Sequence, residues 1–166
     1  MHRASNAQAL VEFGLVLPLL LVTFVGLVSL GRGLVFAVAV QQGSREAARI
    51  GAAAALDTTI TDADVLNRLV TASSPALVGC AAVLATQEQC GDGSWMFTLR
   101  VTAPGGTSSY SSLAAARSSA PGGIGGWQLD VQARGSLPVL FDFDTGIFGS
   151  TLGQIAVQGN AIMVIA

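Results

Sequence analysis

Charge is what this sequence has least of. Lysine is absent, all eight basic residues are arginine, and charged residues make up 11% of the 166 positions. Average soluble domains contain about 25% charged residues. The net charge is −2 and no basic tract occurs. Proteins that bind nucleic acid need clustered positive charge, so we expect no nucleic-acid partner.

Histidine and cysteine are also scarce. The single histidine is His2, and the two cysteines are Cys80 and Cys90. One histidine at the amino terminus leaves no Ser-His-Asp or Cys-His arrangement for the rest of the chain. The glycine-rich residues 122–126 lack the Lys-Ser/Thr of a phosphate-binding loop. We therefore predict no enzyme and no cofactor.

One acidic pair remained as a candidate for chemistry. Asp142 and Asp144 lie two positions apart, so they share a side if that segment is extended. Such a pair can hold a cation or act as acid and base, but it is more often a solvated strand edge.

Hydrophobic residues are abundant, at 51% of the chain, but they are unevenly spread. Residues 13–31 contain no charge. Nineteen helical residues extend about 28 Å, which is close to the thickness of the hydrocarbon core of a bilayer. Leucine and valine cover every side of this segment. The pattern predicts a helix over residues 8–55 with a membrane span at about 13–40, passing Arg32.

The flanks of the apolar segment set its orientation. Arg3 lies on the short side, so the positive-inside rule leaves the amino terminus in the cytoplasm and the rest of the chain outside. Arg32, Arg45 and Arg49 on the other side oppose this bias. A cleavable secretory signal is the rival interpretation, with the Ala-Val-Ala of residues 37–39 as its cleavage site.

Glu12 stands at the head of the apolar run. A carboxylate in hydrocarbon is costly and needs an interface or a partner. The simpler interpretation places Glu12 among lipid headgroups, near a helix amino terminus whose partial positive charge favours it. The alternative is a role in assembly, and it depends on the surrounding residues.

Those residues carry a resemblance. The segment contains Q-A-L-V-E-F at 8–13, L-P-L-L at 17–20, Gly31-Arg32, and Q-Q-G-S-R-E-A-A-R at 41–49. It resembles the amino terminus of the TadE-like family, the minor pilins or pseudopilins of the Flp/Tad type IV pilus machinery. The resemblance covers residues 7–49, and the remainder matches only in general plan.

The resemblance implies processing by prepilin peptidase. Such proteins are cut on the cytoplasmic side so that the acid becomes the fifth mature residue. Counting back from Glu12 places the cut between Ala7 and Gln8, which makes residues 1–7 a leader. The family usually has glycine before the cut, where this chain has Ala7. The implied partners are the lipid bilayer, the peptidase, other pilins and the Tad inner-membrane assembly components.

Cleavage would expose a positive α-amine at Gln8. A neighbouring subunit's Glu12 could pair with that amine in a low-dielectric environment, where either charge alone is unfavourable. This pairing would fix the register between stacked helices. Pro18 lies within the predicted helix and is expected to kink it.

The rest of the chain, residues 56–166, predicts an exported head. Thr61 is a candidate N-cap for a helix to about residue 73. Residues 94–102, 127–134 and 154–165 predict strands, and 103–126 predicts a flexible loop. A long helix followed by a small antiparallel sheet is an α+β, pilin-like arrangement.

The two cysteines fit three interpretations. In an exported head they would form a disulfide that pins a surface loop. Two unpaired thiols are the alternative, while a metal site is poor because zinc wants four ligands. Two functions remain open: an assembly protein of a Tad-type pilus, or an uncleaved, membrane-anchored binding or adhesion module.

Overall fold

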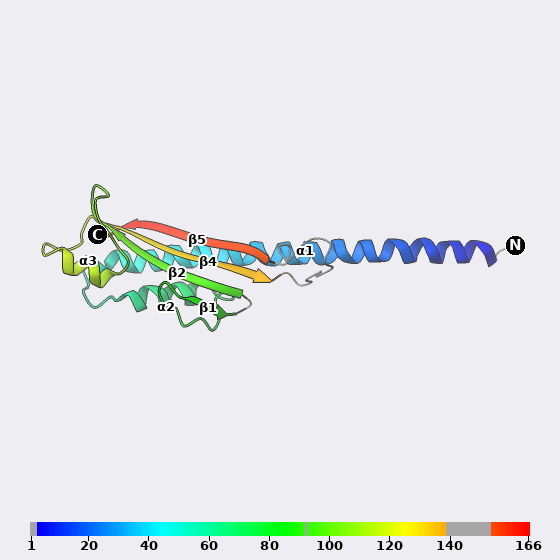
Figure 1. The fold of residues 1–166 in the computed structure, drawn as a ribbon, viewed down its shortest axis with the longest axis horizontal. Coiled ribbons are helices and arrows are strands. Elements are labelled where there is room, and N and C mark those ends of the chain that lie inside the picture. The colour runs from blue at the N-terminus through cyan, green and yellow to red at the C-terminus, as the bar shows by residue number, and fades with distance from the viewer. Residues whose placement is uncertain (1–2, 92, 139–153) are drawn as a thin grey trace.

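A long helix carries a compact head at its carboxyl end in the computed structural model, which describes residues 3–91, 93–138 and 154–166 (Figure 1). The elements are α1 (Arg3–Ala52), a short 3-10 helix η1 (Ala53–Ala55), α2 (Asp62–Ala72), β1 (Gln87–Cys90), β2 (Gly93–Thr102), β3 (Ser109–Tyr110), α3 (Leu113–Ser119), β4 (Gln128–Pro138) and β5 (Gln154–Val164). The predicted α+β class is confirmed.

α1 changes character along its length. Its buried positions start at Ser29 and recur every three or four residues as far as Ala54, where the helix has already become η1. The members of this stripe include Ser29, Gly33, Phe36, Val40, Ser44, Ala47, Ala48 and Gly51. This spacing places them on one side of a 3.6-residue helix. The carboxyl-terminal half of α1 is therefore a core element of the head.

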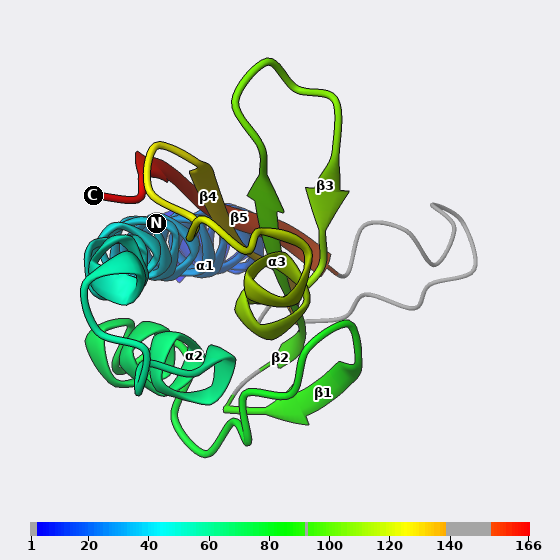
Figure 2. The same ribbon diagram turned by 90° about the vertical axis from the view of Figure 1, so that its left-hand side faces the viewer.

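The sheet is antiparallel, with strand order β1-β2-β4-β5 and with β3 paired to β2. Alternate residues of β2 are buried: Trp95, Phe97, Leu99 and Val101. On β4 the buried residues also alternate: Leu129, Val131 and Ala133. This two-residue period puts a hydrophobic face toward the helices and a polar face outward. Figure 2 shows α1 and α2 together on one side of the sheet.

Two glycines permit close helix contacts. A Cβ on Gly159 of β5 would lie 2.7 Å from the backbone C and O of Val40. A Cβ on Gly43 would meet the Ser73 hydroxyl and would lie 2.8 Å from the Leu69 carbonyl oxygen at the end of α2. β5 and α2 can therefore approach the backbone of α1 directly.

β5 is an edge strand of the sheet, and α1 protects its middle. The Gln41 side-chain amide donates to the Asn160 carbonyl at 2.7 Å, and the Asn160 N–H donates to Gln41 Oε1 at 3.2 Å. Gln41 thus replaces the neighbouring strand residue that Asn160 lacks. Unpaired strand edges promote pairing with strands of other chains. The Gln41 side chain occupies the backbone groups of Asn160 and so prevents such pairing there.

The segment predicted as a loop, residues 103–126, contains β3 and α3. Ser112 caps α3, because its hydroxyl accepts from the Ala115 N–H at 3.0 Å. Composition rich in Gly, Ser and Pro concealed these two short elements, which tertiary contacts stabilise. The strands predicted at 94–102, 127–134 and 154–165 correspond to β2, β4 and β5, with β4 extending further to Pro138. Asp142 and Asp144 lie outside the described residues.

Candidate functional site

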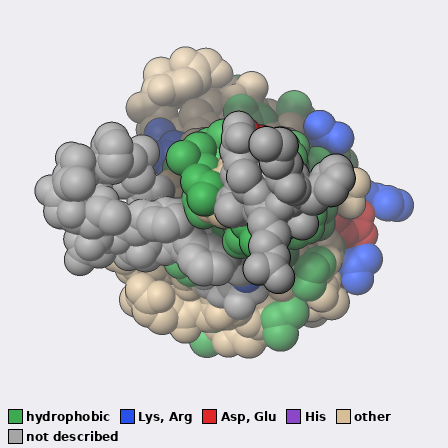
Figure 3. All heavy atoms as spheres, turned by 90° about the vertical axis from the view of Figure 1, so that its right-hand side faces the viewer, with side chains coloured by type: hydrophobic (Ala, Val, Ile, Leu, Met, Phe, Trp, Pro, Cys, Tyr) green, Lys and Arg blue, Asp and Glu red, His purple; other side chains and the backbone are tan. Residues whose placement is uncertain are grey.

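The amino-terminal half of α1 projects from the head with its hydrophobic side chains exposed. Nearly every residue of 10–28 is exposed, and Val25 is half-buried. Viewed from this end, hydrophobic side chains surround the helix (Figure 3). Soluble proteins rarely expose such a large apolar surface. α1 is the one helix in the described part of the chain that is long and apolar enough to cross a membrane.

Glu12 is exposed on α1, two residues past the start of the exposed apolar segment. Gln8 precedes it by four residues, or about 6 Å along the helix axis. Residue 8 and residue 12 therefore lie on the same side of α1.

The Ala7–Gln8 bond, predicted as the processing site, lies inside α1, since the helix begins at Arg3. Only the backbone of these two residues is described. A protease that binds an extended segment must unwind the first turns of α1 before it can cut there. Terminal turns are the least stable part of a helix, which makes this unwinding accessible.

Pro18 lies within α1, which remains continuous on both sides of it. Proline has no backbone N–H, so it cannot donate to the carbonyl of Gly14 one turn earlier. A Cβ on Gly14 would have no neighbour within 4 Å, so this turn is open to its surroundings. The predicted kink stays a prediction.

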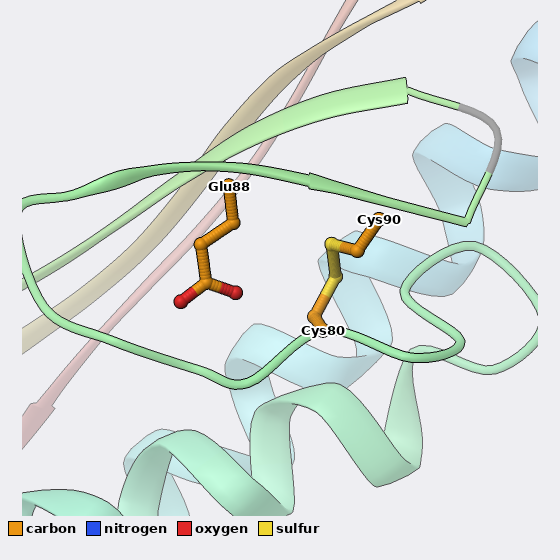
Figure 4. Close-up of side chains that lie close together, drawn as sticks. All are labelled: Cys80, Glu88 and Cys90. Atoms are coloured by element: carbon orange, nitrogen blue, oxygen red, sulfur yellow. A yellow bond between two sulfur atoms is a disulfide. The ribbon is translucent and has the colours of Figure 1, made fainter.

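Cys80 and Cys90 form the predicted disulfide, with their Cα atoms 5.0 Å apart. Glu88 points toward the same loop (Figure 4). Its carboxylate accepts three backbone N–H groups: Ala81 at 2.9 Å, Ala82 at 3.2 Å and Val83 at 2.8 Å. Ala82 has φ of 57°, so successive N–H groups turn toward one point.

The two sulfur atoms and a Glu88 carboxylate oxygen lie within 4.8 Å of one another. This grouping resembles a metal site in composition. The disulfide and the three N–H donors account for all three side chains, because a disulfide offers no thiolate. The cluster closes a loop against β1.

Threonine hydroxyls lower the pKa values of two acids, Asp57 in the α1–α2 connection and Asp64 in the first turn of α2. The Thr61 hydroxyl donates to Asp64 at 2.6 Å and the Thr61 N–H donates at 2.8 Å, and these bonds hold the pKa of Asp64 below its ordinary value. Asp64 N–H donates back to Thr61, which completes a capping box at the start of α2. The Thr59 hydroxyl likewise lowers the pKa of Asp57.

Arg117 of α3 is a structural residue that the sequence did not reveal. Its guanidinium donates to the carbonyls of Ile60 at 2.9 Å, Ala54 at 2.8 Å and Asp57 at 3.3 Å. Carbonyls at the end of a helix lack intrahelical donors and carry partial negative charge. Arg117 therefore caps η1 at Ala54 and holds the connection that follows it, from about 60 residues away in sequence.

Glu46 joins α1 to α2. It accepts from Arg68 at 2.7 Å and lies 3.9 Å from Arg49. The closer contact, with Arg68, depends on the packing of α2 against α1. The sequence offered no signal for Gln41, Glu88 or Arg117, since each meets partners set by the tertiary fold.

The architecture is a long amino-terminal apolar helix that continues into the core of an α+β head with a small antiparallel sheet. The family model described as TadE-like protein matches residues 7–49, which covers most of α1. The resemblance read from the sequence is confirmed over this segment, and it suggests a protein associated with the Tad pilus. No curated protein and no solved structure matches the chain.

Proposed function

We propose that this protein is a TadE-like minor pilin or pseudopilin of a Tad-type pilus. In this proposal α1 anchors it in the cytoplasmic membrane with the amino terminus inside and the head outside. Prepilin peptidase removes residues 1–7, and the mature protein assembles with other pilins and Tad inner-membrane components. The observation that carries the proposal is the family match over residues 7–49, which coincides with the helix that leaves its apolar surface uncovered.

The length of the uncovered segment supports membrane insertion. Residues 10–28 extend about 28 Å as a helix, enough for the hydrocarbon core. Burial against the head begins immediately afterwards, at Ser29. One side of α1 would therefore pack on the head within the predicted span of about 13–40, while its other sides keep exposed hydrophobic residues there: Leu30, Leu34, Val35 and Val38.

The position of Glu12 supports a role in assembly. After a cut before Gln8, the new α-amine would lie one helical turn from Glu12 of its own chain. The amine of one subunit could reach Glu12 of another only at a particular axial offset. A pair of opposite charges in a low-dielectric environment is strongly favourable compared with either charge alone, so this offset would set the register.

The packing of α1 argues against a cleaved secretory signal. A cut after Ala39 would remove Phe36, which is 7% exposed, and Gly33, which contacts Ile155. It would also leave the buried Val40 at a free terminus. A signal peptide contributes nothing to the mature fold, whereas this segment is part of the core.

The test is the intact mass and amino-terminal sequence of the protein extracted from membranes of its own host. A chain that starts at Gln8 supports peptidase processing. A start at Met1 would favour the second candidate, an uncleaved anchored binding or adhesion module. A start after Ala39 would refute the proposal.

A further inference from the structure

The outer face of the sheet, away from α1, contains a hollow of about 550 Å³ with charged and polar side chains in its lining. Its lining includes Thr98 and Arg100 of β2, Tyr110 of β3, and Asp130, Gln132 and Arg134 of β4. Ligand sites in proteins span about 300–1,000 Å³, so the hollow has a suitable size. We call it the outer-face trough.

Two arginines in the trough outnumber its one acid, Asp130. Arg100 and Arg134 are exposed, and neither makes an ion pair or side-chain hydrogen bond in the described part of the chain. By contrast, Glu46, Asp64 and Glu88 all have partners within the head. The trough thus offers two guanidinium groups, which bind carboxylates in a bidentate manner.

The strand register separates the two arginines. Arg100 pairs with Asp130, and Arg134 pairs with Met96. Four residues of β4 separate these two levels, which corresponds to about 13 Å at 3.3 Å per residue. A single small anion cannot reach both groups, so two negative charges on one extended ligand fit better.

Neutral hydrogen-bonding groups fill the space between the arginines. Gln132 lies between them on β4, and its amide donates to Asp130 Oδ2 at 2.7 Å. This bond orients Gln132 and leaves its carbonyl oxygen as an acceptor. Thr98 pairs with Gln132 across the strands, which adds a hydroxyl. Asp130 Oδ1 has no hydrogen-bond partner in the described chain.

We propose that the outer-face trough binds an acidic polysaccharide. Carboxylates on separate sugar units pair with Arg100 and Arg134, while intervening hydroxyls bond to Gln132, Thr98 and the Asp130 carboxylate. This site is independent of α1 and of the proposed assembly function. It would give the exported head an affinity for acidic polymers at a cell or environmental surface.

The same face is a poor site for an acidic peptide. Peptides commonly bind by adding a strand to a sheet edge or by placing a helix in an apolar groove. β2 and β4 are interior at this point, since β4 pairs with both β2 and β5. Their backbone groups are already used, and the lining is polar apart from Met96 and Leu99.

A single-stranded nucleic acid is also disfavoured. Such ligands stack their bases on exposed aromatic rings along a basic groove. The one aromatic residue of the lining, Tyr110, is half-buried and already stacks on Trp127, with ring centroids 5.7 Å apart. Two arginines beside one aspartate provide little of the charge that nucleic-acid binding requires.

The experiment measures binding of oligogalacturonate to the full chain in neutral-lipid nanodiscs. Arg100→Gln and Arg134→Gln should each weaken binding by about tenfold, because each removes a bidentate charged contact. Arg45→Gln is the matched control, since Arg45 is exposed on α1 outside the trough, and it should leave binding unchanged. Added salt should weaken the wild-type interaction.

Arginine-to-lysine variants at the same positions control for folding defects. They should bind with intermediate affinity, because lysine keeps the positive charge but lacks the forked N–H donors of the guanidinium. A neutral oligosaccharide of equal length should bind poorly. The proposal is overturned if oligogalacturonate does not bind, if the trough variants bind like wild type, or if oligoglutamate binds more tightly than the sugar.

Discussion

Single polar side chains determine how the parts of this molecule are joined. Glu46, Glu88 and Arg117 each link segments that are separated in sequence, through bonds to a side chain or to backbone groups. Only 11% of the residues are charged, so the chain has few side chains that can form such links. Loss of one link should therefore measurably lower the stability of the head.

Arg117 gives the clearest stability prediction at this scale. Arg117→Ala should destabilise the head by about 2–3 kcal/mol, because three carbonyls lose a charged donor and some are shielded from water. The measurement is thermal unfolding of the detergent-solubilised chain followed by fluorescence of Trp95, which is fully buried. Arg49→Ala serves as the control, and its exposed pair with Glu46 should contribute no more than about 0.5 kcal/mol. Equal effects of the two changes would contradict the capping role.

Glu12 gives the functional prediction. Glu12→Ala should insert into the membrane normally, because it makes the segment more apolar, but should lower co-purification with other pilus subunits by about tenfold or more. Leu15→Ala, on the same exposed segment, should assemble nearly as wild type. The readout is the amount of crosslinked complex per inserted protein. Normal assembly of Glu12→Ala would rule out charge pairing.

Asp64 predicts a pH dependence. Its pKa is lowered in the folded protein by the Thr61 hydroxyl and N–H. A lowered folded-state pKa contributes stability above the ordinary value of 3.8, and this contribution disappears as pH falls through the folded-state value. Asp64→Asn should therefore flatten the loss of stability below about pH 4. Unfolding measured from pH 7 downward tests this, and an unchanged acid slope would contradict it. Asp57, held by Thr59, should keep part of the slope in both proteins.

Among the elements, α1 does two jobs with two surfaces. Before Ser29 it is exposed and apolar, and after it one side packs on β5, β4 and α2. Glycine permits the packing of the second surface, since α2 reaches the backbone of α1 at Gly43. Glycine has a low helix propensity, and the closer packing offsets the stability lost in this way.

Substitution of this glycine tests the contact. Gly43→Ala should destabilise the head by about 1–3 kcal/mol, because the new Cβ collides with the Ser73 side chain and the Leu69 carbonyl. Gly31→Ala is the matched control on the same helix, since its Cβ would meet nothing within 4 Å, and it should be neutral or slightly stabilising. Thermal unfolding distinguishes them. A destabilisation by Gly31→Ala as large as that by Gly43→Ala would contradict the explanation by close packing, because helix propensity favours alanine at both positions.

At the scale of the whole molecule, the head combines one hydrophobic core with local fastenings. In the part of the chain that the structure describes, twenty-four buried hydrophobic residues from the helices, the sheet and the connections between them belong to a single cluster. The disulfide and the Glu88 carboxylate both fasten the loop before β1, at the periphery of that cluster. The two fastenings are chemically independent, so the loop should survive the loss of one.

Removal of the disulfide tests that arrangement. Cys80→Ser with Cys90→Ser should lower the stability of the head by about 2–3 kcal/mol, as expected for a loop with a separation of 10 residues. Adding Glu88→Gln to this variant should lower the stability of the head by more than the sum of the two separate effects, because the loop then loses both the disulfide and the carboxylate contacts. Membrane insertion should be unaffected, since α1 is untouched. Simple additivity, measured by thermal unfolding, would contradict the shared role.

The sequence by itself determined the features that depend on neighbouring residues. The length of the apolar run, the place of Glu12 within it, the capping of α2 by Thr61 and the pairing of only two cysteines are all local or nearly local. Bilayer thickness and helix geometry then lead directly from the residues to a helix that is long and apolar enough to cross a membrane. Alternating patterns predicted the strands at 94–102 and 127–134, and a less regular apolar run predicted the strand at 154–165.

Only the tertiary structure decided which side of α1 the head covers and which polar groups meet. Arg117 contacts η1, Gln41 contacts the edge of β5, and the outer-face trough forms from three strands, each through contacts between distant segments. A stripe of small residues at Ser29, Gly33 and Gly43 looks the same in sequence whether it faces lipid or protein. The physical reason is that local propensity fixes the elements, while burial and hydrogen bonding between them fix their partners.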